Sequence, residues 1–123
     1  MPAPVRKSFT FLSRHAPYGR DNAQICLELV LATAVYEQTV NYLFMDDGVY
    51  QLVDSQQPRT IHNKTLSANL QALSLYGVET VYVDSESLRQ RRLSIDDLVI
   101  QVQLLSDDEV TAMIRTADVV FPL

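Results

Sequence analysis

The chain has 123 residues, of which 47% are hydrophobic and 20% charged, and its formal net charge is −5. This length and balance suit one domain over residues 1–123, with residues 1–6 as a flexible tail. The acidic balance argues against direct nucleic-acid binding. No apolar run reaches the roughly 18 residues of a membrane helix, so we expect no membrane contact.

Cysteine usage and the amino terminus bear on where the protein works. The first seven residues contain prolines and basic residues but no apolar signal core, and Cys26 is the single cysteine. One cysteine forms no internal disulfide, and no Cys/His spacing suggests zinc. We therefore expect a cytoplasmic protein with no metal and no cofactor.

The predicted elements begin with a strand over residues 7–13, which contain two phenylalanines and a leucine. A loop with proline and glycine follows over residues 14–20. Asp21 or Asn22 can cap the next helix, which we expect to run to about residue 37.

The second predicted strand, residues 39–45, is apolar, β-branched and aromatic, as in a strand buried on both faces. It stops abruptly at an Asp-Asp-Gly sequence, residues 46–48. Sites in open α/β sheets lie at this end of the strands, so we expect polar groups to gather here. The apolar residues of the same loop that should pack back on the domain or on a neighbour are Val49, Tyr50 and Leu52.

The middle of the chain predicts another helix and strand. Residues 54–59 are polar and contain a proline, which is typical of an exposed connection. Leucines at helical spacing predict a helix over about residues 64–76, with Gly77 as its carboxyl-terminal cap. Residues 79–83 predict the third strand, and residues 85–92 predict a short helix or turn.

The last part of the chain repeats this alternation. Residues 94–97 offer a capped turn before a fourth predicted strand, residues 98–104. An S-x-x-E capping box over residues 106–109 predicts a helix to about residue 117, and residues 118–121 predict a short fifth strand. This pattern implies an α/β fold: a three-layer α/β/α sandwich, flavodoxin- or Rossmann-like, with a mostly parallel sheet of about five strands.

The predicted first helix has two apolar faces. A helix that covers a sheet needs only one of them. We expect a partner subunit to bury the other, although another helix of the same domain could cover it. The residues of this second face are Ile25, Leu29, Ala32 and Tyr36.

Three residues come into question as nucleophile or acid–base groups. Cys26 lies inside the helix on its core face, where a thiol is structural rather than reactive. His15 follows the first strand and could act as acid or base, or bind an anion with Arg14 and Arg20; a solvated loop histidine is the simpler interpretation. His62 lies in a polar connection and should be at the surface.

The carboxylates at strand ends are also ambiguous. Asp46 and Asp47 could bind a metal or a hydroxyl group, but adjacent side chains of an extended chain point to opposite sides. A turn before Gly48 explains them at least as well. Asp84 follows the third strand at the same edge, and it or Ser85 should cap the next helix.

The one basic cluster is Arg89, Arg91 and Arg92. It could contact RNA or an acidic partner, or be the solvated face of a short helix. The phosphate-binding patterns GxGxxG and GxxxxGK[ST] and the zinc-binding pattern HExxH do not occur. The sequence thus predicts no catalytic residue.

Four stretches, in this order and spacing, resemble a known family. They are APYG (16–19), DGVYQL (47–52), LYGVE (75–79) and SLRQRRL (87–93). From about residue 8 to residue 121 the chain resembles the DsrE/DsrF-like family, and within it the TusC (DsrF-like) subunits. One departure is Arg92, where relatives often have glycine.

The resemblance implies a non-catalytic subunit of a sulfur relay. It implies TusB-like and TusD-like partners in a heterohexamer with two of each subunit, although the chain alone could form a homo-oligomer. Such a complex passes persulfide sulfur from a TusA-like to a TusE-like carrier, for 2-thiouridine formation at the tRNA wobble position. The TusD-like subunit holds its sulfur on a cysteine just after the third strand, whereas residues 81–85 here contain none.

Other functions remain open at this point. Some DsrEFH-type proteins act in sulfur oxidation instead. A small enzyme could use His15 and the Asp46-Asp47 loop on a small anionic substrate. A third alternative is a ligand- or nucleotide-binding module of flavodoxin-like fold.

Overall fold

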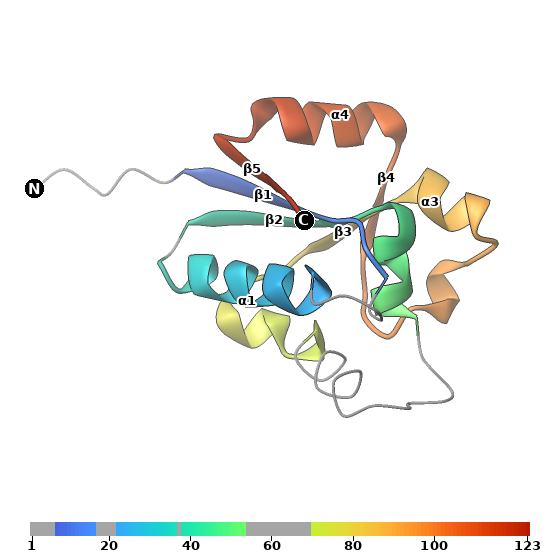
Figure 1. Cartoon of the computed structure of the whole chain (residues 1–123), viewed down its shortest axis with the longest axis horizontal. Coiled ribbons are helices and arrows are strands. Elements are labelled where there is room, and N and C mark those ends of the chain that lie inside the picture. The colour runs from blue at the N-terminus through green and yellow to red at the C-terminus, as the bar shows by residue number, and fades with distance from the viewer. Residues whose placement is uncertain (1–6, 17–21, 37, 54–69) are drawn as a thin grey trace, which may run out of the picture.

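In the computed structural model of the chain, residues 7–16, 22–36, 38–53 and 70–123 are described. A five-stranded sheet forms the middle layer (Figure 1), with strand order β4-β3-β2-β1-β5 and every pair parallel. The strands are β1 (Ser8–Ser13), β2 (Thr39–Phe44), β3 (Val81–Asp84), β4 (Gln103–Leu105) and β5 (Val119–Pro122). The predicted α/β class with a parallel sheet of five strands is confirmed.

Helices cover both faces of the sheet. α1 (Asn22–Val35) and the 3-10 helix η2 (Leu73–Tyr76) lie on one face, and α4 (Asp107–Thr116) lies on the other (Figure 1). The 3-10 helix η1 (Asp46–Leu52) and α3 (Ser85–Gln90) lie beyond the carboxyl ends of the strands. This arrangement confirms the three predicted layers. The segments that contain η1 and α3 meet at the carboxyl edge of the sheet.

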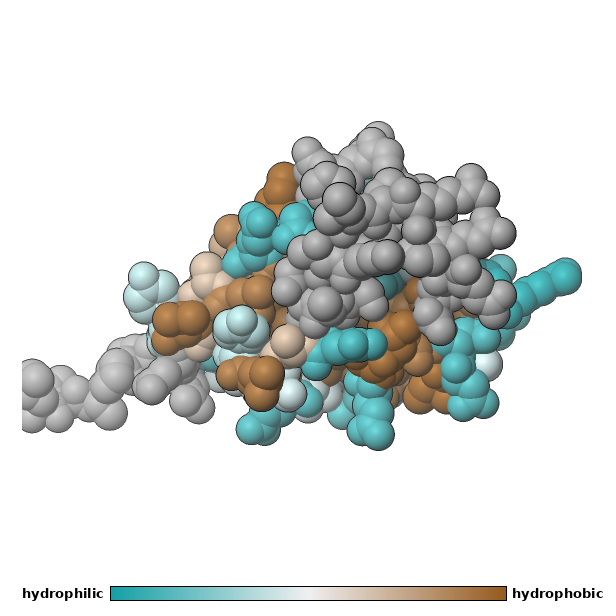
Figure 2. Space-filling model, turned by 90° about the horizontal axis from the view of Figure 1, so that it is seen from below, coloured by the Kyte–Doolittle hydropathy of each residue, from teal (hydrophilic) through white to brown (hydrophobic). Residues whose placement is uncertain are grey.

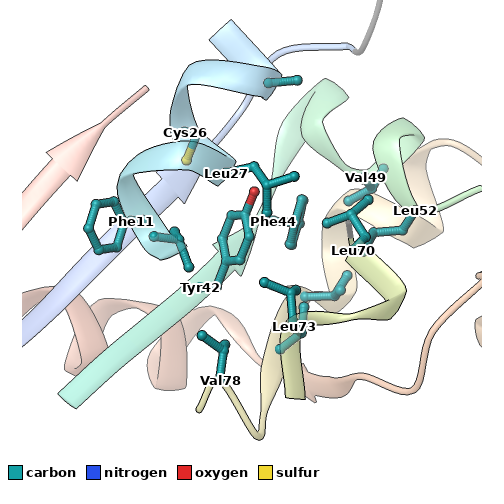
Figure 3. Packing of buried hydrophobic residues seen from close by; sticks show 14 of the residues in the cluster. Phe11, Cys26, Leu27, Tyr42, Phe44, Val49, Leu52, Leu70, Leu73 and Val78 are labelled. Atoms are coloured by element: carbon teal, nitrogen blue, oxygen red, sulfur yellow. The ribbon is translucent and has the colours of Figure 1, made fainter. Parts of the chain in front are cut away.

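The sheet separates two apolar clusters. The larger lies between the sheet and α1 and includes the fully buried Phe11, Leu27, Tyr42 and Phe44 (Figure 3). The smaller joins α4 to the other face through Leu12, Leu43, Leu105 and Val110. A strand buried on both faces needs apolar residues at every position. Only the carboxyl half of β2 meets this condition, with Tyr42, Leu43 and Phe44, because its amino half is less buried and contains Thr39 and Asn41.

Local sequence signals explain several boundaries. Ser106 and Glu109 form the predicted capping box at the start of α4. Gly77 ends η2 with a left-handed φ of 91°, as expected of a glycine cap. A second capping box, Ser94 with Asp97, starts the 3-10 helix η3 (Ile95–Asp97).

The prediction of a strand over residues 98–104 is wrong for residues 98–102, because β4 begins only at Gln103. The backbone N–H of Val99 donates to the carbonyl oxygen of Leu52 at 2.7 Å, and Leu98 forms an isolated antiparallel bridge with Val53. The apolar run therefore reflects packing against the end of η1 rather than strand pairing.

Three further boundaries differ from expectation. The loop over residues 46–52 is a 3-10 helix, and the third strand begins at Val81 rather than at residue 79. β5 ends at Pro122, one residue beyond the predicted end. Among the described strands β5 pairs with β1 alone, and an edge strand tolerates a residue without N–H. The predictions for residues 1–6, 17–20, 54–59 and 64–69, and for Asp21 and His62, lie outside the described residues.

Candidate functional site

The carboxyl edge of the sheet brings together residues from three strand ends. Ser13 pairs in register with Phe44, and Phe44 pairs with Val83. Ser13 and Asp84 are therefore the last residues of neighbouring strands at this edge, and Asp46 lies just beyond the end of β2 between them. η1 and α3 close over this edge and contact each other (Figure 1). The predicted gathering of polar groups at this edge is therefore present.

Gly48 allows η1 to approach β1. The residue is buried, and a Cβ atom at this position would collide with the carbonyl oxygen of Ser13. The same oxygen accepts a hydrogen bond from the backbone N–H of Met45 at 3.1 Å. Val49 and Leu52 are fully buried and Tyr50 is half-buried, so the apolar part of this segment packs on the domain as expected.

Ser87 connects the turn after β2 to the turn after β3. Its Oγ donates to Asp84 Oδ2 at 2.6 Å and accepts from the backbone N–H of Asp46 at 2.8 Å. Asp46 adopts a left-handed φ of 50°, which is strained for a residue other than glycine. The hydroxyl of Ser87 thus holds this strained turn in place.

The sequence predicts Asp84 or Ser85 as the cap of α3. Asp84 occupies the N-cap position, but its side chain makes no capping hydrogen bond. The carboxylate is nearly buried and bonds the Ser87 hydroxyl instead, and Asp84 Oδ1 has no partner among the described residues. Sequence reasoning missed Ser87, although a hydroxyl three residues after an N-cap aspartate is within reach of it.

The carboxylates of Asp46 and Asp47 do not act as a pair. Asp47 Oδ1 accepts from the guanidinium of Arg91 at 2.9 Å, and Arg91 also donates to the carbonyl oxygen of Ser87 at 3.2 Å. Within the described ranges, no three His, Cys, Asp or Glu side chains are grouped to hold a metal ion. Asp47 therefore has a structural contact in this chain, which attaches η1 to α3.

A second network lies on the α1 side of the edge. The buried amide of Gln51 donates to Ser13 Oγ at 2.7 Å and to the carbonyl oxygen of His15 at 2.9 Å. It ties η1 to the chain that leaves β1. His15 itself is half-buried, and the neighbouring Arg14 is exposed. Sequence reasoning missed Gln51. The one feature that could have indicated its role is that it is a polar residue within the apolar run that ends at Leu52.

Cys26 is fully buried against β1 and β2 (Figure 3). Desolvation by burial raises the pKa of its thiol from 9.0 to about 11, and the nearby hydroxyls of Ser13 and Tyr42 oppose this rise only in part. The end of β3 carries Asp84 rather than a thiol. Because the chain has one cysteine, it presents no accessible thiolate for sulfur chemistry.

Comparison with known proteins agrees with this geometry. The sequence profile of the DsrE/DsrF-like family matches residues 7–123. The chain belongs to the DsrE/DsrF-like family. Its fold is also similar to that of the ychN protein from E. coli in its crystal structure, with a TM-score of 0.81 and 22% identity over 97% of this chain and 100% of that one.

Two relatives of this DsrE/DsrF-like chain carry functional descriptions. It is 36% identical over 119 residues to a "Protein TusC homolog" of Pseudomonas aeruginosa, covering 97% of this chain and 100% of the relative. It is 46% identical over 95 residues to the "Intracellular sulfur oxidation protein DsrF" of Allochromatium vinosum, covering 77% of this chain and 70% of the relative. Both descriptions concern those proteins.

Two of the three arginines in the basic cluster form ion pairs within the chain. Arg91 pairs with Asp47, and Arg89 pairs with Glu86, which lowers the pKa of that carboxylate. Arg92 adopts a left-handed φ of 55°, the backbone conformation that favours glycine. The turn therefore keeps a glycine-like shape although arginine stands there.

The second apolar face of α1 remains exposed in this DsrE/DsrF-like domain. Ile25 is 46% exposed, Leu29 39% and Tyr36 75%, and Ala32 is exposed as well. No element in the described part of the chain covers them. None of the described helices is long and apolar enough to cross a membrane.

Proposed function

We propose that this chain is a non-catalytic structural subunit of a cytoplasmic sulfurtransferase complex. As one DsrE/F-like domain it assembles with TusB-like and TusD-like chains, two of each subunit in a heterohexamer. The complex receives persulfide sulfur from a TusA-like carrier and passes it through a TusE-like carrier toward 2-thiouridine formation at the tRNA wobble position. This chain contributes structure and takes no covalent sulfur.

The state of Cys26 is the observation that carries the proposal. A persulfide forms on an exposed thiolate, and this thiol is fully buried with its pKa raised to about 11. The carboxyl end of β3 offers Asp84, whose carboxylate cannot accept sulfur as a persulfide. Similarity to TusC homologs supports membership of the complex, and the buried thiol supports a non-catalytic place within it.

The exposed α1 face supports assembly. A monomer that left Ile25, Leu29 and Tyr36 in water would keep a large apolar surface on one helix. We assign these residues, with Ala32, to a contact with another subunit. The carboxyl-edge residues His15, Asp46, Asp47, Gly48, Tyr50 and Asp84 shape the rim of the domain, and none is given a catalytic role.

Sulfur transfer through a reconstituted complex tests the proposal. Cys26→Ala should leave transfer near the wild-type rate, and mass spectrometry after turnover should find persulfide on the TusD-like chain and none on Cys26. Loss of transfer by a Cys26→Ala complex that retains all its subunits would show a catalytic role and contradict the proposal.

A second function, in sulfur oxidation, is favoured by the 46% identity to DsrF over 95 residues. Deletion of the gene distinguishes the tRNA-thiolation function from the sulfur-oxidation function. The tRNA-thiolation function requires that the strain lose wobble 2-thiouridine, as measured by mass spectrometry of digested tRNA. Unchanged 2-thiouridine together with slowed oxidation of stored sulfur would support the DsrF-like function instead.

A further inference from the structure

The large apolar side chains exposed at the surface are concentrated on one side of the molecule. Those on α1, directly after it and on η2 are Ile25, Leu29, Val35, Tyr36, Leu75 and Tyr76, whereas Ile95, Leu104 and Phe121 lie elsewhere. α1 and η2 contact each other below the sheet (Figure 1), so their exposed residues lie on the same side of the sheet. Figure 2 views the molecule from this side and shows apolar side chains exposed on it, interspersed with hydrophilic ones.

The η2 turn presents Leu75 and Tyr76 in a fixed conformation. Leu73 is buried in the core, and the N–H of Val78 donates to its carbonyl oxygen at 3.2 Å. The left-handed Gly77 donates to Ser74 at 3.2 Å and closes the turn. Leu75 is nonetheless 84% exposed and Tyr76 51%. A rigid turn loses little entropy on binding, and tyrosines are frequent anchors of interfaces.

The charged residues that the structure describes within α1 and η2 and shortly after η2 are acidic. Glu28 lies on the same side of α1 as Ile25 and Leu29, because residues spaced by three and four share a helix face, and it is exposed. Glu79 follows η2 and is exposed as well. The described residues of α1 and η2 include no lysine or arginine, and the ion pairs of the described chain, Asp47–Arg91 and Glu86–Arg89, lie elsewhere.

This charge distribution decides between two kinds of partner. A second copy bound about a two-fold axis would present the same residues, so Glu28 and Glu79 would face a surface on which α1 and η2 carry no lysine or arginine. A different chain with lysine or arginine at these points would have complementary charge. The face therefore fits a heterologous partner better than itself.

We infer that α1 and η2 together form the docking face for a different chain, whose matching surface is apolar and bears lysine or arginine opposite Glu28 and Glu79. The inference rests on the proposed function. It adds to that function the contact residues Leu75 and Tyr76 of η2 and the charge of the partner surface.

The test measures binding of this chain to co-expressed TusB-like and TusD-like chains by analytical ultracentrifugation. Leu75→Asp and Glu28→Lys should each raise the dissociation constant by about tenfold or more. Ile95→Asp and Asp108→Lys are matched controls at exposed positions outside the face, and should bind as wild type. Circular dichroism of each free variant verifies that it is folded.

Salt dependence provides the second measurement. Binding of the wild-type chain should weaken as ionic strength rises from about 0.05 to about 0.5 M, and Glu28→Gln with Glu79→Gln should reduce this dependence. A wild-type complex that tolerates both Leu75→Asp and Glu28→Lys would overturn the inference and leave the proposed function standing. Absence of any wild-type complex would overturn both. A dimer of this chain alone that Leu75→Asp abolishes would show that the occupant is a second copy.

Discussion

At Gly48 the backbone of η1 passes directly over the end of β1. Any Cβ atom here would collide with the Ser13 carbonyl oxygen, which is itself held by the N–H of Met45. Because neither backbone can yield easily, Gly48→Ala should lower the free energy of unfolding by at least about 3 kcal/mol, measured by urea denaturation. Gly77→Ala is the control: its Cβ would enter open space, and only the φ of 91° resists it, for about 1–2 kcal/mol. Equal decreases in the free energy of unfolding for the two variants would contradict the prediction that a Cβ atom at position 48 collides with Ser13.

Also at the scale of one residue, the buried thiol of Cys26 makes stability depend on pH. The pKa is 9.0 for an ordinary thiol and about 11 in the folded chain, so folding favours the neutral form. This stabilisation is complete below pH 9.0 and is lost as pH rises to about 11, because the unfolded chain ionises first. Between these values wild type should lose about 2–3 kcal/mol more than Cys26→Ala.

The pH prediction is checked by urea unfolding of both proteins across this range. The difference between them removes the contribution of the tyrosines other than Tyr42, whose raised pKa depends in part on Cys26. A thiol reagent should also label native Cys26 slowly and the unfolded chain quickly. Rapid labelling of the native protein would mean that the thiol is accessible and would count against the structural role.

At the scale of the elements, one hydroxyl joins η1 to α3. Ser87→Ala would remove the donor to Asp84 Oδ2 and the acceptor of the Asp46 N–H, leaving both groups without these bonds. We expect a loss of about 2–3 kcal/mol in the free energy of unfolding and faster hydrogen exchange at the Asp46 amide. Ser85→Ala, on the same helix but outside this network, should change neither. Unaltered exchange at Asp46 in Ser87→Ala would mean that the hydroxyl does not hold the turn.

At the scale of the whole molecule, the exposed side of α1 should determine assembly. Leu29 is 39% exposed in the isolated chain, so Leu29→Glu should leave the fold intact. A buried, unpaired carboxylate at a subunit contact is strongly unfavourable, so the variant should elute from size-exclusion chromatography without its partners. Leu104→Glu changes a leucine of similar exposure, 41%, at the β4 edge and should still assemble. If Leu29→Glu still formed an unchanged complex, the assignment of α1 to the subunit interface would be wrong.

Much of the architecture was determined by the sequence alone, because its signals are local. Alternating strand and helix patterns, the capping box at Ser106 and the glycine cap at Gly77 each depend on neighbours a few residues away. The two apolar faces of α1 follow from helical periodicity in the same way, and they correctly separated buried Cys26 from exposed Leu29.

Only the tertiary structure decided which residues meet at the carboxyl edge. Ser87 contacts Asp46, Arg91 contacts Asp47 and Gln51 contacts Ser13, all across separations of 38 to 44 residues. These contacts depend on the register of β1, β2 and β3, which no local pattern specifies. The same reason explains the misplaced fourth strand. An apolar run predicts burial, but whether it pairs in a sheet or packs against η1 depends on what folding brings beside it.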